Sequence, residues 1–158
     1  RHYATGEAMP TDLVERLAQS QTFLEGLATL RQLGFGLLDM AWHDARTAPN
    51  DLEQLERDAF ASVDVWPAVD SSFISPSFSH IFAGGYSAGY YSYKWAEVLD
   101  ADAYGFFREA PDQAAPRFRT LLESGGTVDP MDLYVAFRGR QPQPEALLRR
   151  AGLLNPTA

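Results

Sequence analysis

The sequence predicts an all-α fold, organised as a single helical domain over residues 1–158. Two long segments repeat apolar residues every three or four positions, which is the period of a helix and not of a strand. Proline, aspartate and glycine stand where several shorter helices are expected to begin and end. No run of residues shows the alternation of apolar and polar side chains that would favour a set of strands.

The first third of the chain is expected to hold a short helix and a long one. The short helix begins at Pro10, and the long helix covers about residues 22–44. The long helix contains three glycines, each of which weakens a helix by about 1 kcal/mol relative to alanine. We therefore expect Gly26, Gly34 and Gly36 to allow close packing against a neighbouring element.

The middle of the chain is expected to alternate between helix and loop. The pair Asn50-Asp51 should cap the next helix, with Glu53 as the capping-box partner of Asn50, and Pro67 should end it. Residues 69–85 are rich in serine, proline and glycine, which predicts an ordered but irregular loop. A second long helix is then expected over about residues 87–109.

Three shorter helices are expected in the last third. The first follows Pro111 and ends at Gly125, where glycine is a common C-cap. The second begins at Asp129, and the third covers residues 144–151 and is closed by Gly152.

Composition excludes several classes of function. The formal net charge of −8 makes nucleic acid a poor partner, because an acidic surface repels phosphate. The absence of cysteine excludes disulfides and thiolate chemistry. No stretch reaches the roughly 18 consecutive apolar residues of a membrane span, and the N-terminus lacks a secretory signal pattern. A cytoplasmic protein is expected. The first residue is not methionine, as expected for a chain cut from a longer one.

An aromatic segment is the strongest candidate for a functional site. Tyr86, Tyr90 and Tyr93 are spaced i, i+4, i+7, so they should share one face at the start of the second long helix. Phenolic hydroxyls on one face can donate hydrogen bonds to an oxygen that gains negative charge. On spacing alone, an aromatic core stripe with local hydroxyl partners is the commoner pattern. The residues just before this face are His80, Gly84 and Gly85.

The histidines do not form a recognisable metal or catalytic motif. His2, His43 and His80 are far apart in sequence, and none belongs to a His-Glu-x-x-His helix. The sequence therefore predicts no metal site within this chain. No Gly-x-Ser-x-Gly turn is present, so nothing favours a self-contained hydrolase that uses His43 or His80 with an acidic residue.

The aromatic segment resembles a known family. Residues 80–97 read His-Ile-Phe-Ala-Gly-Gly-Tyr-Ser-Ala-Gly-Tyr-Tyr-Ser-Tyr-Lys-Trp-Ala-Glu, which is similar to the C-terminal signature of the M3 (thimet oligopeptidase) family of zinc metallopeptidases. Within the family, the likeness is to the bacterial oligopeptidase A type. Further segments resemble family landmarks in the same order, and these are residues 2–7, 23–33, 130–140 and 146–153. The resemblance therefore covers nearly the whole chain.

The resemblance implies a fold, an activity and a cofactor. Family members are longer, two-lobed helical peptidases that hydrolyse short peptides with a zinc ion held by His-Glu-x-x-His and a later glutamate. This chain would be the C-terminal part of the catalytic lobe, with the zinc motif upstream of it. Alone it should hold no zinc and be inactive, and its partners would be the remainder of the lobe and oligopeptide substrates.

The resemblance also implies roles for individual residues. Tyr86 and Tyr93 would donate hydrogen bonds to the oxyanion and to the substrate carbonyl. His80 and Tyr90 would contact substrate. The pair of glycines at positions 84 and 85 would let the loop approach the peptide, and these residues are Gly84 and Gly85.

Two further hypotheses stay open from the sequence. The chain could be a non-catalytic helical module, derived from the same family, that binds peptides or a partner. Aromatic side chains that the missing lobe would cover could also remain exposed and lead to self-association. The candidates for exposure are Phe82, Tyr86 and Tyr90.

Overall fold

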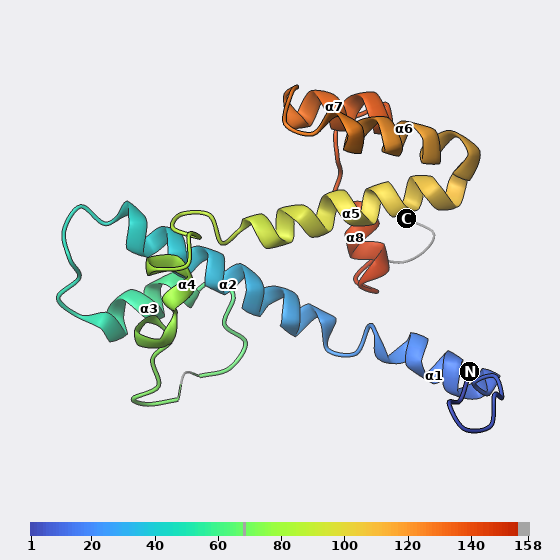
Figure 1. The fold of residues 1–158 in the computed structure, drawn as a ribbon. Helices are drawn as coiled ribbons and strands as arrows, with labels where there is room; N and C mark the ends of the chain where they lie inside the picture. Colours follow the sequence, from blue (N-terminus) through green and yellow to red (C-terminus); the bar gives the residue numbers. More distant parts are fainter. Residues whose placement is uncertain (68, 155–158) are drawn as a thin grey trace.

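The structure is a computed structural model that describes residues 1–67 and 69–154. Over these residues the chain is helical and contains no strand, which confirms the all-α prediction. Two long helices dominate the molecule, α2 (Glu25–Asp44) and α5 (Ser92–Glu109) (Figure 1). Most of the shorter helices gather around one or the other of these two.

The first half of the molecule packs around α2. Its other elements are α1 (Thr11–Ser20), α3 (Leu52–Phe60), the 3-10 helix η1 (Ser75–Ser77) and α4 (Ser79–Phe82). One face of α2 and the segment through α4 bury a small apolar core made of Phe35, Leu38, Phe78 and Ile81. A side chain at Gly34 would overlap the ring of Phe60, so close packing of α3 on α2 requires glycine at this position.

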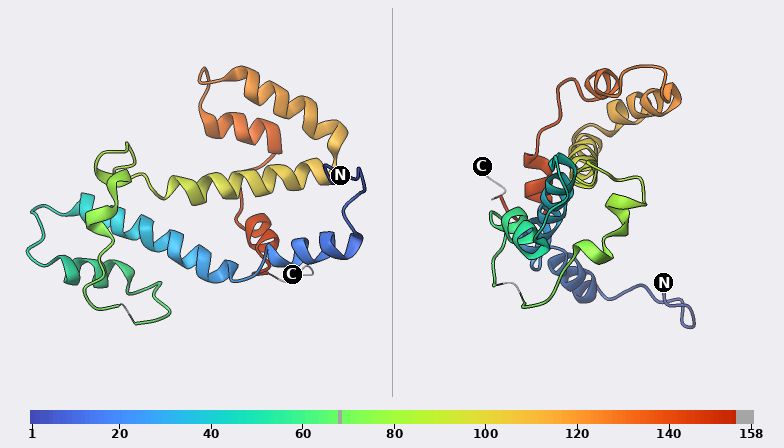
Figure 2. Two further views of the ribbon diagram at one scale, coloured as in Figure 1. Left: turned by 60° about the horizontal axis from the view of Figure 1, so that its bottom comes forward. Right: turned by 90° about the vertical axis from the view of Figure 1, so that its left-hand side faces the viewer.

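The second half packs around α5. The helices α6 (Pro111–Ser124) and α7 (Pro130–Arg138) lie on one side of α5, and α8 (Glu145–Arg150) lies on the other (Figures 1 and 2). Its core is separate from that of the first half and consists of Phe106, Ala114, Tyr134 and Phe137. Whether the two clusters fold as one domain stays a prediction.

Two predicted helix boundaries and one predicted capping box in the first half are wrong. The helix α2 begins at Glu25, because Leu24 has a left-handed backbone with φ of 55°. Of the two residues predicted to cap α3, Asp51 is the cap, and its carboxylate accepts the N–H of Gln54 at 2.9 Å. The predicted capping box does not form, since Glu53 pairs with Arg57 instead. The helix also ends at Phe60, well before the proline that was expected to end it.

Two boundaries in the middle also differ from prediction, while those of the last third are close. The region predicted as a loop, residues 69–85, contains the short helices η1 and α4. The helix α5 begins at Ser92 and not at residue 87, because Ala88 has a φ of 51° that no helix accommodates. The predicted start of α7 is confirmed by Asp129, whose carboxylate accepts the N–H of Met131 at 2.8 Å. Gly125 ends α6 as predicted.

Apolar side chains remain exposed, above all near the N-terminus. The helix α1 buries none of its residues and extends beyond the N-terminal end of α2 (Figure 1). Of the three aromatics expected to be exposed, Phe82 is 51% exposed, while Tyr86 and Tyr90 are half-buried. Self-association through such surfaces stays a prediction. In the part of the chain that the structure describes, none of the helices combines the length and the apolar character needed to cross a bilayer.

Candidate functional site

The structure brings the four predicted aromatic residues together between α4 and α5. The rings of Tyr86 and Tyr93 stack with centroids 5.3 Å apart and an interplanar angle of 21°. Tyr90 lies 5.2 Å from Tyr93 and 6.2 Å from Tyr86, measured between ring centroids. The ring of His80 lies 6.1 Å from that of Tyr86. The candidate site is therefore one contiguous aromatic cluster.

Two tyrosine hydroxyls in this cluster form what we call the hydroxyl pair. The hydroxyl of Tyr93 donates to that of Tyr86 at 2.8 Å. Each phenol carries a single proton, so this bond leaves the proton of Tyr86 free to donate outward. Tyr93 is 43% exposed, so another molecule can reach the pair. The hydrogen bond with Tyr86 is the main cause that raises the pKa of Tyr93 above its ordinary value.

The tyrosines converge through a turn and not through a continuous helix. Residues 86–91, which we call the tyrosine turn, form two tight turns closed by the bonds Gly89 N–H to Tyr86 O at 2.9 Å and Ser92 N–H to Gly89 O at 3.1 Å. The prediction of a common face is therefore confirmed in its result, although its premise of a helix was wrong. Only Tyr93 lies on the helix α5 itself.

Tyr90 joins the cluster to the core of the first half. Its ring meets that of Phe78 at 4.9 Å and that of Phe35 at 5.8 Å, both edge-on. Such edge-on pairs are a favoured packing of buried aromatic rings. Tyr90 therefore fits the core-stripe hypothesis, whereas Tyr86 and Tyr93 stack outside it with their hydroxyls accessible.

The glycine pair makes a sharp exit from α4 possible. A Cβ atom at Gly84 would lie 2.8 Å from the Cα atom of His80 and 2.9 Å from its carbonyl oxygen. Gly85 has a φ of +82°, a conformation that glycine adopts at little cost. Both glycines are thus explained by the turn itself, and a role in letting a peptide approach stays a prediction.

Asp39 is an important residue of the site that sequence reasoning missed. It lies on α2, is fully buried, and accepts three consecutive backbone N–H groups of the tyrosine turn. The bonds come from Ala88, Gly89 and Tyr90, each at 2.9 Å. A signal was present in the sequence, because this aspartate follows Leu38 inside a strongly apolar helix. A buried carboxylate needs strong partners, and the sequence does not say where they lie.

His43 supports the same carboxylate. Its Nδ1 atom lies 2.8 Å from Oδ1 of Asp39 and 2.8 Å from the backbone oxygen of that residue. Both partners are acceptors, so Nδ1 carries the proton. Among the described residues no serine or threonine hydroxyl is bonded to the rings of His43 or His80, and Ser87 donates to the carbonyl of Ile81 at 2.6 Å. The geometry thus lends no support to a self-contained hydrolase built on a histidine.

The described residues do not fit a zinc site. Across residues 1–67 and 69–154, no three side chains of histidine, aspartate or glutamate lie close enough together to hold a metal ion. His43 uses Nδ1 on Asp39, and His80 lies among aromatic rings. No step of a reaction through zinc can be derived from this chain alone.

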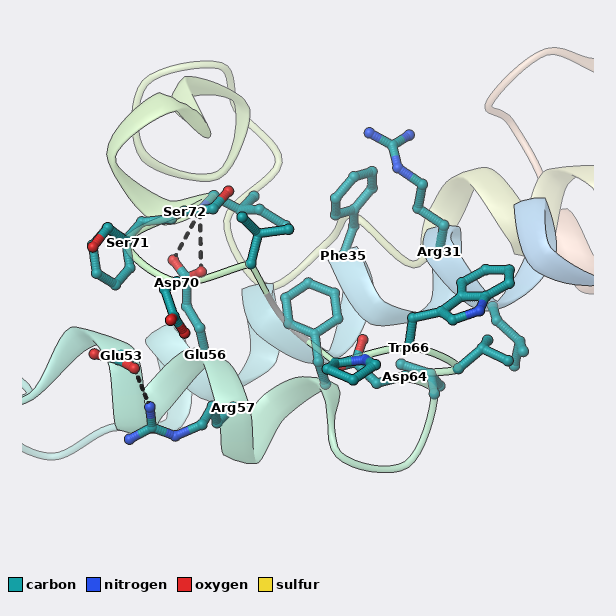
Figure 3. A pocket seen from close by; sticks show the side chains of 18 of the residues that line it. Arg31, Phe35, Glu53, Glu56, Arg57, Asp64, Trp66, Asp70, Ser71 and Ser72 are labelled. Carbon is teal, nitrogen blue, oxygen red and sulfur yellow. Dashed lines mark hydrogen bonds and ion pairs between the residues drawn. The ribbon is translucent and has the colours of Figure 1, made fainter.

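Two hollows lie on the surface of α2, and one of them reaches the candidate site. The first, of about 510 Å³, lies between α2, α3 and the segment that follows α3, and includes Phe35, Glu56 and Trp66 but none of the predicted site residues (Figure 3). The second, of about 450 Å³, lies between α2 and the start of α5 and is lined by Tyr90, Tyr93 and Lys94. A ligand in this second hollow would contact the ring of Tyr93.

The comparisons with known proteins agree on one family for this chain. The sequence model of the family described as Peptidase family M3 matches residues 1–153. An organellar oligopeptidase A (chloroplastic/mitochondrial) of Arabidopsis thaliana is 42% identical over 100% of this chain and 21% of its own length. Oligopeptidase A of Haemophilus influenzae is 44% identical over 98% of this chain and 24% of its own length. A dipeptidyl carboxypeptidase of Salmonella typhimurium is 38% identical over 97% of this chain and 24% of its own length. The chain thus spans less than a quarter of the length of these relatives.

Proposed function

The chain belongs to peptidase family M3, and from this premise we propose that the whole protein is a zinc-dependent oligopeptidase that hydrolyses peptide bonds in short peptides. This chain would form the helical C-terminal part of its catalytic lobe. Relatives named oligopeptidase A support the substrate class. The observation that carries the proposal is the exposed hydroxyl pair of Tyr86 and Tyr93.

The hydroxyl pair suits peptide hydrolysis because the carbonyl oxygen gains negative charge as the bond is attacked. A positioned donor strengthens its hydrogen bond as this charge develops, and so lowers the barrier. Tyr86 can donate its free proton to this oxygen without giving up its bond to Tyr93. The proton donated by Tyr93 also polarises the hydroxyl of Tyr86, which makes it a better donor. Tyr93 can donate to a substrate carbonyl only after it turns away from Tyr86.

The other predicted residues would contact the substrate around this pair. His80 is exposed, and its ring lies beside that of Tyr86, so it is accessible to a bound peptide. Tyr90 and Tyr93 line the hollow between α2 and α5, which offers room for part of a peptide. Gly84 and Gly85 would allow the backbone of the peptide to lie near the turn.

The cofactor, partner and compartment are further parts of the proposal. Zinc would be held by other parts of the whole protein, because the described residues do not fit a zinc site. The surface that remains exposed here, including Phe82, would pack against the remainder of the catalytic lobe. We place the protein in the cytoplasm, as for the probable cytosolic oligopeptidase A of Arabidopsis thaliana. Another relative from that plant is named as organellar, so a tagged protein should be localised directly.

The experiment replaces one hydroxyl at a time in the whole protein with zinc bound. Tyr86→Phe should lower kcat by about 10²- to 10³-fold with little change in KM, because the contact strengthens only in the transition state. Tyr93→Phe should lower kcat as well. Tyr91→Phe is the matched control, since Tyr91 is 59% exposed and lies outside the aromatic cluster.

If both Tyr86→Phe and Tyr93→Phe keep full kcat, the hydroxyl pair is structural and the proposed roles are wrong. If the whole protein with zinc hydrolyses no peptide but still binds peptides, the chain belongs to a non-catalytic binding module instead.

A further inference from the structure

We propose that Asp39 is the positioning residue of the hydroxyl pair: its buried carboxylate fixes the backbone of the tyrosine turn so that Tyr86 and Tyr93 meet in the reactive arrangement. This inference rests on the proposed function of the pair. Asp39 itself touches no substrate, because it is fully buried beneath the turn.

Both oxygens of the Asp39 carboxylate accept hydrogen bonds. Oδ1 accepts the N–H of Ala88 and lies 2.8 Å from Nδ1 of His43, while Oδ2 accepts the N–H groups of Gly89 and Tyr90. Three backbone N–H groups therefore donate to the two oxygens, and His43 lies against Oδ1 while its hydrogen bond goes to the backbone oxygen of Asp39. An asparagine would offer one oxygen and would turn an N–H₂ group toward other donors, so it could not replace this arrangement.

The tyrosine turn depends on this anchor for two reasons. Ala88 has a φ of 51°, a conformation that a residue with a side chain adopts only when its surroundings hold it there. Three successive N–H groups also donate to Asp39, and among the described residues those of Ala88 and Tyr90 have no other acceptor. Without these bonds, the two unpaired and partly buried N–H groups would favour another conformation of the turn.

A movement of the turn would separate the two hydroxyls. Tyr86 is two residues before Ala88, whereas Tyr93 lies one residue inside the helix α5. The 2.8 Å bond between the hydroxyls thus joins the turn to the helix, and it breaks if the turn shifts by about 1 Å. Asp39 would therefore affect catalysis by holding the two hydroxyl oxygens within hydrogen-bond distance of each other.

The chain contains a matched control for this role in Glu56. Its carboxylate is also buried, at 8% exposure, and also accepts backbone N–H groups, from Ile74 and from Ser75 at 2.7 Å (Figure 3). The segment that it holds contains none of the candidate site residues. Removal of the charge from Glu56 and from Asp39 should therefore disturb similar bonds but affect catalysis differently.

The first test measures backbone hydrogen exchange in the whole protein, which needs no activity. Asp39→Asn should accelerate exchange in peptides that cover Ala88, Gly89 and Tyr90 by about tenfold or more, and leave residues 74–77 unchanged. Glu56→Gln should do the reverse. Unchanged exchange across the turn in Asp39→Asn would overturn the inference, whatever the activity.

The second test measures kcat and KM for the same variants. Asp39→Asn should lower kcat by about 10²-fold, as expected for a displacement of about 1 Å, while Glu56→Gln should stay within about twofold of the parent. In a Tyr86→Phe background, Asp39→Asn should cause little additional loss, because the two residues act as one unit. Losses that multiply would overturn the positioning role.

A milder pair of variants covers the case in which Asp39→Asn does not fold. His43→Leu removes the polar contacts of Nδ1 with the carboxylate and the backbone oxygen of Asp39, and should lower kcat by about two- to tenfold. His43→Asn can place an amide nitrogen near the position of Nδ1 and should restore most of that loss. Equal activity of His43→Leu and the parent would contradict the inference. If Tyr86→Phe and Tyr93→Phe both retain full kcat, the proposed catalytic role of the hydroxyl pair is wrong, and hydrogen exchange still decides whether Asp39 holds the turn.

Discussion

The two halves of the molecule each bury an aspartate, and they use it in different ways. In the first half, Asp39 accepts backbone N–H groups from a turn. In the second half, Asp102 accepts only from side chains: the hydroxyl of Tyr134 at 2.8 Å, Nη2 of Arg140 at 2.6 Å and Nε of Arg138 at 3.2 Å. Backbone bonds fix the course of the chain, whereas side-chain bonds join elements whose course is already set.

The difference teaches where a functional site should be sought. Burial raises the pKa of Asp102, but hydrogen bonds from Tyr134, Arg140 and Arg138 outweigh it, so that the net pKa is lowered. The pKa of Tyr134 is raised by its burial and by Asp102. Perturbed pKa values often mark active sites. Here this perturbed pair joins α5 to α7 and lies outside the aromatic cluster, so it is structural.

The largest effect is expected from breaking the Asp102 network. Asp102→Asn leaves Arg140 without its charge partner and leaves Arg138 with only its longer contact to Glu109 at 3.7 Å, and removal of one member of a buried ion pair costs about 3–5 kcal/mol. Denaturant unfolding of the whole protein measures this loss, and kcat of the folded variant should stay unchanged. Asp100→Asn is the control, since its pair with Arg150 is exposed and is worth no more than about 1 kcal/mol.

This prediction can break the comparison between the two halves. If folded Asp102→Asn protein loses as much kcat as Asp39→Asn, then the second half contributes to catalysis and the distinction drawn between backbone and side-chain anchoring is wrong.

The dependence of stability on pH provides a smaller test of the same network. The folded-state pKa of Asp102 is lowered, so its contribution is fully present above the ordinary aspartate pKa of about 3.9. The contribution is lost as pH falls below that value and through the folded pKa. The stability advantage of the parent over Asp102→Asn should therefore shrink when unfolding is measured at successively lower pH below about 4. An advantage that stays constant down to about pH 2 would contradict the lowered pKa.

The sequence predicted those parts of the fold that depend on local rules. The period of apolar residues identified both long helices, and Asp129 and Gly125 marked real helix ends because caps act on neighbouring residues. The start of α5 was predicted five residues too early, since the φ of 51° at Ala88 depends on bonds to an aspartate 49 residues away. A local rule cannot include such a partner.

The sequence predicted which residues form the candidate site, but not the turn and the hydrogen bonds that bring them together. The three tyrosines were expected on one face, and their rings do meet, because the turn brings Tyr86 and Tyr90 beside Tyr93. The bond between two hydroxyls could not be predicted, as it depends on side-chain orientation. Asp39 was overlooked because the three N–H groups that donate to its carboxylate lie about 50 residues further along the chain.

The smallest expected effect compares one glycine from each half. Gly34 of α2 and Gly105 of α5 both lie inside long helices, where alanine is intrinsically favoured by about 1 kcal/mol. A Cβ atom at Gly34 would overlap the ring of Phe60, whereas one at Gly105 would meet no atom within 4 Å. Gly105→Ala should therefore stabilise the protein by about 0.5–1 kcal/mol.

Gly34→Ala should instead destabilise the protein, because overpacking of a core costs about 1–3 kcal/mol and exceeds the gain in helix propensity. Denaturant unfolding of the two variants under the same conditions measures the difference directly. The ring of Phe60 must move away from α2, and α3, which carries Glu56, must move with it. If both variants are stabilised equally, the ring moves without resistance, and the packing of α3 on α2 is looser than the fit of Phe60 over Gly34 indicates.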